Sequence, residues 1–135
     1  MHLPIVLAML AMTFCGACAQ STKKKSKDAD KQALTYTNID VATFDQLRSE
    51  SDCIVLDVRT PEECGEGMVD NAVELDFYSD DFETKLKKLD RNSKYLVYCR
   101  SGGRSSNASE MMISLGFKDV SNLEGGYTKW SEEHQ

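Results

Sequence analysis

The stretch YLVYCRSGGRS, residues 95–105, decides the fold. Its apolar first half is typical of a buried parallel strand, and Cys99 follows at the carboxyl end, the edge at which open α/β sheets bind ligands. Gly102 and Gly103 allow backbone N–H groups to turn toward one point, and a helix that begins near Arg104 adds the positive end of its dipole. An isolated cysteine at a strand end is more often a small buried apolar residue. The glycines and the helix start stabilise an anionic sulfur, so the stretch predicts a nucleophile.

The charge of the sequence is unevenly distributed, which restricts the partners. The formal net charge is −6 over 135 residues, but residues 23–31 hold five lysines and two aspartates. Residues 32–135 therefore carry 11 basic and 20 acidic side chains, a net charge of −9. A body this acidic argues against nucleic-acid binding, so we expect Arg100 and Arg104 to act as local ligands for a small anion.

The cysteines and histidines exclude several kinds of chemistry. The chain has five cysteines, which are Cys15, Cys18, Cys53, Cys64 and Cys99. Residues 32–135 contain no Cys-x-x-Cys pair and no Cys/His cluster, so we expect neither a metal site nor a cofactor. The two histidines, His2 and His134, lie near the ends of the sequence. We therefore expect Cys99 to be activated by backbone dipoles and arginines instead of a histidine base.

Residues 1–18 are typical of a signal peptide of the bacterial lipoprotein type. The apolar stretch that begins at Leu3 is too short to span a membrane, and it ends in the small-residue sequence CGAC, which indicates Cys18 as the lipidated residue. Cleavage after Ala19, at an A-x-A sequence, is the alternative. Residues 19–33 are polar and lysine-rich, so they predict a disordered tether. We expect the chain in the cell envelope, periplasmic or otherwise outside the cytoplasm, with the lipid as its only membrane contact.

Residues 34–135 alternate between strand-like and helix-like segments, which predicts one α/β domain. The expected strands are Tyr36–Ile39, Cys53–Val58, Ala72–Leu75, Lys94–Cys99 and Val120–Leu123. Helices are expected after Asp40, from Thr60-Pro61, from Asp81 to Leu89, from Arg104 to Leu115, and after Gly125-Gly126. Such alternation favours a central parallel sheet with helices on both faces.

Three segments of this body resemble the rhodanese family, specifically its single-domain sulfurtransferases. LDVRTPEE at residues 56–63 is similar to the family segment L-D-V-R-x-x-x-E. CRSGGRS at residues 99–105 is similar to the active-site loop C-R-x-G-x-R-S, and LEGGYTKW at residues 123–130 to the terminal L-x-G-G-x-x-x-W. The three segments match in order over a body of roughly residues 36–132, and the resemblance implies a rhodanese-like domain.

The resemblance also implies a function. Cys99 would take the outer sulfur of a small anionic donor such as thiosulfate, become a persulfide, and pass this sulfur to a thiol or to cyanide. The backbone of Arg100, Ser101, Gly102, Gly103 and Arg104 would cradle the transferred sulfur. Both arginines would hold the donor, or Arg104 would fold inward and brace the loop. Asp57 and Arg59 would be mainly structural, and we expect the protein to act as a monomer.

Two rival functions are consistent with a similar fold. A related phosphatase or arsenate reductase needs arginine six positions after the cysteine, whereas this sequence has Arg104 at five and Ser105 at six. A non-catalytic binding module would have no need of Cys99. The sequence also departs from the family at residues 67–69, where Gly-Met-Val replaces Gly-His-Ile, and at Cys64, where an aromatic residue is common. We interpret Cys64 as a small buried residue, with a redox partner for Cys99 as the alternative.

Overall fold

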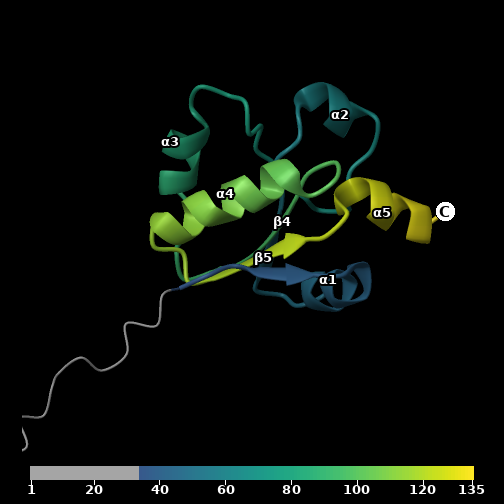
Figure 1. Ribbon diagram of the computed structural model, residues 1–135, viewed down its shortest axis with the longest axis horizontal. Helices are drawn as coiled ribbons and strands as arrows, with labels where there is room; N and C mark the ends of the chain where they lie inside the picture. Colours follow the sequence, from purple (N-terminus) through teal and green to yellow (C-terminus); the bar gives the residue numbers. More distant parts are fainter. Residues whose placement is uncertain (1–33) are drawn as a thin grey trace, which may run out of the picture. The chain divides into compact units, whose positions relative to one another are not determined.

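The fold is described for residues 34–135 by a computed structural model (Figure 1). The predicted signal peptide and tether, residues 1–33, lie outside the described residues. Within the described part, five strands form one parallel sheet in the order β1-β5-β4-β2-β3. The strands are β1 (Thr37–Ile39), β2 (Cys53–Asp57), β3 (Val73–Glu74), β4 (Lys94–Tyr98) and β5 (Asp119–Leu123).

The apolar run before Cys99 forms the central strand β4, as predicted. Its neighbours are β2 and β5, and its residues Tyr95 to Tyr98 are fully buried. Because both faces of this strand are buried, its side chains on both faces are apolar, and the segment forms a continuous apolar run in the sequence. Asp57 at the end of β2 is paired with Tyr98, so the chain leaves β2 and β4 side by side at one edge of the sheet.

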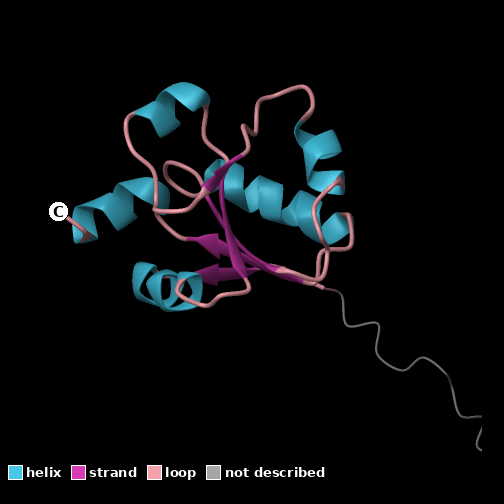
Figure 2. Cartoon of the chain, turned by 180° about the vertical axis from the view of Figure 1, so that it is seen from behind, coloured by secondary structure: helices cyan, strands magenta, loops and turns pink. Residues whose placement is uncertain are grey.

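Helices cover both faces of the sheet (Figure 2). They are α1 (Val41–Arg48), α2 (Pro61–Gly65), α3 (Phe82–Lys87), α4 (Gly103–Ser114) and α5 (Gly126–Glu133). Residues of α3 and α4 pack on the face that carries Val97 and Cys99. Residues of α1 and α5 pack on the opposite face, against Leu96 and Tyr98.

Side-chain caps stand at two helix starts that the sequence predicted. Asp40 accepts a hydrogen bond of 2.8 Å from the Thr43 N–H and caps α1. Thr60 and Glu63 form a reciprocal capping box, with Pro61 at the first position of α2. Each device satisfies N–H groups that have no partner inside the helix.

Several expected elements are shorter or packed differently than the sequence indicated. β3 is reduced to two residues and α3 ends at Lys87, so Leu89 lies beyond the helix and is partly buried. On α4, Ser105 and Ser109 are completely buried beside Ala108 and Met112. Among the described residues, no helix is both long enough and apolar enough to span a membrane.

Candidate active site

Cys99 directly follows the central strand, and donors of the next loop and helix face its sulfur. The residue is 1% exposed. The Gly102 N–H donates a hydrogen bond of 3.1 Å to Sγ, and the Ser105 hydroxyl lies 3.3 Å from it. The same hydroxyl is 3.1 Å from the Gly102 carbonyl oxygen, so its single proton can be given to either acceptor.

These donors favour the thiolate form of Cys99. Burial by itself would raise the pKa of the thiol, because it penalises the charged form. Hydrogen bonds from the Ser105 side chain and from the backbone of Ser105, Gly102 and Ser101 outweigh burial and lower the pKa below its ordinary value. Backbone dipoles and arginines were expected to activate Cys99. The causes of the lowered pKa are backbone donors and the Ser105 side chain, and neither loop arginine is among them.

The loop after Cys99 is held from outside by the first turn of α5. The Tyr127 N–H donates to the Cys99 carbonyl at 2.8 Å, and the Thr128 N–H donates to the Arg100 carbonyl at 3.0 Å. Gly126 makes this approach possible, since a Cβ atom there would lie 2.5 Å from the Cys99 carbonyl oxygen. Both carbonyls are therefore engaged by α5, while the Gly102 N–H points to the sulfur.

The two arginines of the loop have different surroundings. Arg100 is exposed and makes no ion pair with any described residue. Arg104 forms a bidentate ion pair with Glu63, with both N–O distances at 2.7 Å. Its guanidinium also lies 5.4 Å from the ring centre of Tyr78. Of the two roles predicted for Arg104, this geometry favours bracing of the loop against α2, and Arg100 remains the available cation.

The other predicted loop residues lie at the surface. Ser101 and Gly103 are exposed, and Gly102 is partly buried with φ at 111°. This backbone conformation is one that glycine adopts most readily, and it allows the Gly102 N–H to face Sγ.

Asp57 and Arg59 form a buried ion pair at the end of β2. Arg59 donates from Nη2 to Asp57 at 2.6 Å and to the Gly67 carbonyl at 2.6 Å. The Tyr98 hydroxyl donates to the same carboxylate and accepts from the Val69 N–H at 3.1 Å. Burial would lower the pKa of Arg59, but the Asp57 contacts outweigh it and raise the pKa. The pair thus joins β2, β4 and the segment after α2, which is consistent with the structural role predicted for it.

Cys64 is buried, as expected for a small packing residue. Burial, together with the nearby Asp57 carboxylate, raises its pKa to about 12. Cys53, Cys64 and Cys99 are all free in the described part of the chain. A thiol with so high a pKa is a poor nucleophile at neutral pH, so Cys64 is unsuited to be a redox partner of Cys99.

Sequence reasoning did not single out Ser105 as a donor or Glu63 as a partner of Arg104. Both residues lie inside segments that carry the family resemblance, 99–105 and 56–63. Both residues are therefore part of the matching motifs, but the motifs do not indicate that α2 and α4 are in contact.

The Glu63–Arg104 pair should make stability depend on pH on the acid side. The hydrogen bonds from Arg104 are the main reason that the pKa of Glu63 falls from 4.5 to about 2. A carboxylate with a lowered folded-state pKa stabilises the protein above its unfolded-state pKa and loses this contribution as the pH falls toward the folded-state value. We expect Glu63→Gln to reduce the free energy of unfolding at pH 7 by about 1–3 kcal/mol. The difference from wild type should shrink between about pH 5 and pH 2.

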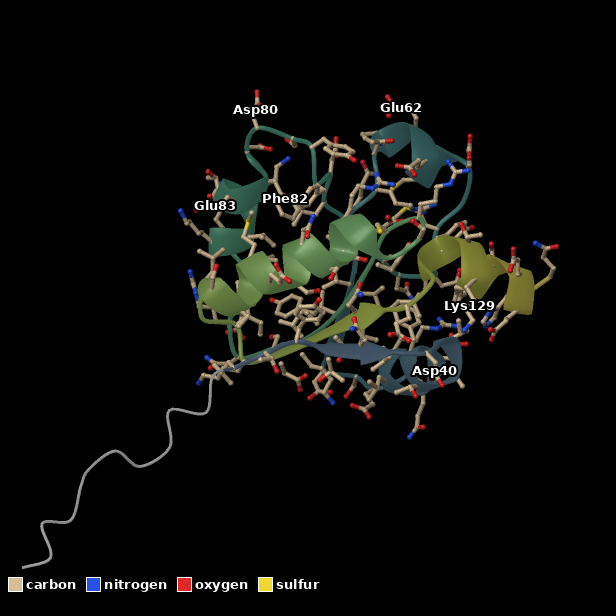
Figure 3. All side chains as sticks on the ribbon, in the orientation of Figure 1. Asp40, Glu62, Asp80, Phe82, Glu83 and Lys129 are labelled. Atoms are coloured by element: carbon tan, nitrogen blue, oxygen red, sulfur yellow. The ribbon has the colours of Figure 1, made fainter. Side chains whose placement is uncertain are left out.

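The measurement is urea unfolding of both proteins across that pH range. Glu62→Gln is the matched control, because Glu62 is the neighbouring acid on α2 and projects into solvent (Figure 3). A Glu63→Gln variant with the same pH dependence as wild type would show that the pair contributes nothing measurable.

A parallel α/β domain with a thiolate-stabilising loop after its central strand defines the class of protein. The sequence model of the rhodanese-like domain matches residues 40–133, and the chain belongs to this family.

Relatives named as sulfurtransferases are among the similar proteins. The putative sulfurtransferase YtwF of Bacillus subtilis (strain 168) is 36% identical over 92 residues, which are 68% of this chain and 86% of that protein. A tRNA uridine(34) hydroxylase of Cytophaga hutchinsonii is 36% identical over 110 residues, which cover 79% of this chain but only 35% of the hydroxylase. The crystal structure of a rhodanese-related protein from Thermoplasma volcanium superimposes with a TM-score of 0.64 at 35% identity, over 73% of this chain and 93% of that one.

Proposed function

We propose that this chain is a thiosulfate-type sulfurtransferase that carries sulfur on Cys99. The observation that supports the proposal most directly is the pair of donors on Cys99 Sγ, the Gly102 N–H and the Ser105 hydroxyl. A preformed set of donors around one sulfur stabilises a thiolate, and it also suits the anionic outer sulfur of a persulfide. Relatives that carry sulfurtransferase names add support for a reaction of this type.

In the first half-reaction, the Cys99 thiolate attacks the outer sulfur of thiosulfate. A bond forms between Sγ and that sulfur, the sulfur–sulfur bond of thiosulfate breaks, and sulfite leaves with the electron pair. Arg100 is the cation in position to attract the dianionic donor, since Arg104 is engaged by Glu63. No proton is transferred in this step, so a histidine base is not required.

In the second half-reaction, a thiolate or cyanide attacks the outer sulfur of the persulfide. The bond between Sγ and this sulfur breaks, and Cys99 recovers its electron pair as a thiolate. The hydrogen bonds that lower the pKa of Cys99 also make it a better leaving group in this step. The same groups therefore serve both halves of the cycle.

The test is to locate the transferred sulfur. After thiosulfate treatment we expect one adduct of about +32 Da, the mass of one sulfur atom, on the peptide that contains Cys99. Cys53 and Cys64 should stay unlabelled, because burial raises their pKa to about 11 and about 12. Label on either of these two residues, with Cys99 unmodified, would overturn the proposal.

We further propose that the domain acts as a monomer outside the cytoplasm, tethered by a lipid on Cys18. The sequence CGAC after an apolar stretch and the lysine-rich segment 19–33 support this location. We expect the native protein in the membrane fraction, and Cys18→Ala in a form that is not held there. Cys15→Ala is the matched control and should remain membrane-bound. Recovery of wild type in the cytoplasm with Met1 intact would contradict the proposal.

A further inference from the structure

A pocket lies directly beside the Cys99 loop, on the side of α2 and α5. Its volume is about 260 Å³, and its lining includes Arg59, Glu66, Arg100, Thr128, Ser131 and Glu132. Arg100 is the residue after Cys99, and its carbonyl accepts from Thr128, so the pocket shares a wall with the loop. The inference below rests on the proposed sulfurtransferase function, and it concerns which acceptor takes the sulfur.

One end of the pocket presents an incompletely satisfied buried cation. Arg59 is 3% exposed. Among the described residues, its side chain donates hydrogen bonds from Nε and Nη2 only. The remaining nitrogen, Nη1, makes no hydrogen bond to a described residue and keeps a small contact with solvent. The ring of Tyr127 covers one face of the guanidinium at 4.0 Å. The edge with Nη1 is therefore left for a ligand of this pocket, and an anion suits it.

Charges of both signs surround the rest of the pocket. Arg100 adds a second positive charge to the pocket, whereas the exposed carboxylates of Glu66 and Glu132 add negative charge. None of these three residues forms an ion pair with another described residue. Glu63 also lines the pocket, but its carboxylate is already engaged by Arg104.

We propose that this pocket is the acceptor subsite, and that it selects a small zwitterionic thiol of the amino-acid type. The carboxylate of the acceptor binds Arg59 Nη1 and Arg100, and its ammonium group binds between Glu66 and Glu132. A dianionic donor would meet two repelling carboxylates in this pocket, whereas a zwitterion satisfies both signs of charge. A pocket volume of about 260 Å³ accommodates a ligand of amino-acid size.

The transfer itself needs no other reactant. The acceptor thiolate forms a bond to the outer sulfur of the Cys99 persulfide, and the bond between that sulfur and Sγ breaks. The acceptor leaves as a persulfide, and Cys99 is restored as the thiolate. The pocket contributes binding and orientation of the acceptor, which raise the rate of this step.

The charge of the pocket can be changed without altering the loop. We compare wild type with the double variant Glu66→Gln/Glu132→Gln. The matched control is Glu62→Gln/Glu133→Gln, which removes one exposed carboxylate from α2 and one from α5, neither of which lines the pocket. Figure 3 labels Glu62 on α2 and Lys129 on α5, the two helices that carry these substitutions.

The readout is the discharge of a preformed Cys99 persulfide in a single turnover. The acceptors are L-cysteine, cysteamine, 3-mercaptopropionate and cyanide, and each rate is compared between proteins so that intrinsic thiol reactivity cancels. We expect the pocket variant to be slower by about fivefold with cysteine and cysteamine, which have the ammonium group. Its rates with 3-mercaptopropionate and cyanide should not fall, and the control variant should match wild type throughout.

A binding measurement tests the pocket independently of the chemistry. S-methyl-L-cysteine has both charges but no reactive thiol, and we expect it to shift the amide signals of Tyr127 and Thr128 in NMR spectra of the resting protein. Its N-acetyl and methyl-ester derivatives should shift them much less, as should S-methyl-L-cysteine with the pocket variant. Equal effects of all three compounds, or a pocket variant that discharges every acceptor at the wild-type rate, would overturn the inference. Failure of thiosulfate to form a persulfide would instead reject the proposed function, and the binding result would still decide whether the pocket recognises a zwitterion.

Discussion

Replacing Cys99 by serine is expected to abolish sulfur transfer, with a loss on the order of 10⁴-fold or more. A serine hydroxyl is not ionised at neutral pH and cannot hold a sulfane sulfur, although it fits the space of the thiol. The Gly102 N–H and the Ser105 hydroxyl would still find an oxygen acceptor, so the fold should be retained. The measurement is thiocyanate production from thiosulfate and cyanide, with circular dichroism to verify folding.

Cys53→Ser is the control for this experiment. Cys53 begins the neighbouring strand β2 and is partly buried. Burial raises its pKa to about 11, so it should not contribute to transfer, and the control should keep an activity within about twofold of wild type. Comparable losses in both variants would show that Cys99 has no special role.

The second large effect is expected from Gly126→Ala, at a residue that touches no substrate. A Cβ atom there would lie 2.5 Å from the Cys99 carbonyl oxygen and 2.6 Å from the Arg100 carbonyl oxygen. These are backbone atoms, so only a shift of the loop or of α5 relieves the overlap. The φ of 58° adds about 1–2 kcal/mol for any residue with a side chain.

We expect Gly126→Ala to lower kcat/KM by about 100-fold, the scale of a misplacement of about 1 Å in an active site. The matched control is Gly65→Ala, because nothing lies within 4 Å of a Cβ atom at that position. It should leave activity and stability close to wild type. If Gly126→Ala keeps full activity in a fully folded protein, the first turn of α5 does not position the loop.

The sequence was most informative where a local pattern determines a local structure. The central strand could be predicted from its apolar run, and the starts of α1 and α2 from Asp40 and Thr60. Cys99 could be predicted as the candidate nucleophile because its strand, its glycines and the following helix are contiguous. Each of these predictions depends on neighbours within a few residues.

Contacts between distant segments could not be predicted in this way. Nothing local indicates that Glu63 and Arg104, 41 positions apart, meet as an ion pair. The contribution of Tyr98 to the Asp57–Arg59 pair depends in the same way on the pairing of β2 with β4. The pocket beside Arg100 is formed by α2 and α5, whose neighbourhood follows from strand order and not from either segment alone.

The parallel direction of every strand has a practical consequence for attaching this protein to a sensor surface. Thr37 pairs with Ser121, and Ser121 pairs with Leu96, so Thr37 and Leu96 lie at the same height in the sheet. The strand β1 therefore begins about 10 Å before Cys99 along the strand direction. Leu34 lines a small groove with Ile113, near the far end of α4 from the loop. Leu34 is therefore an attachment point at the opposite end of the described domain from the Cys99 loop. Gln135, in contrast, lines the pocket beside Arg100, so coupling at Gln135 would obstruct access to this pocket.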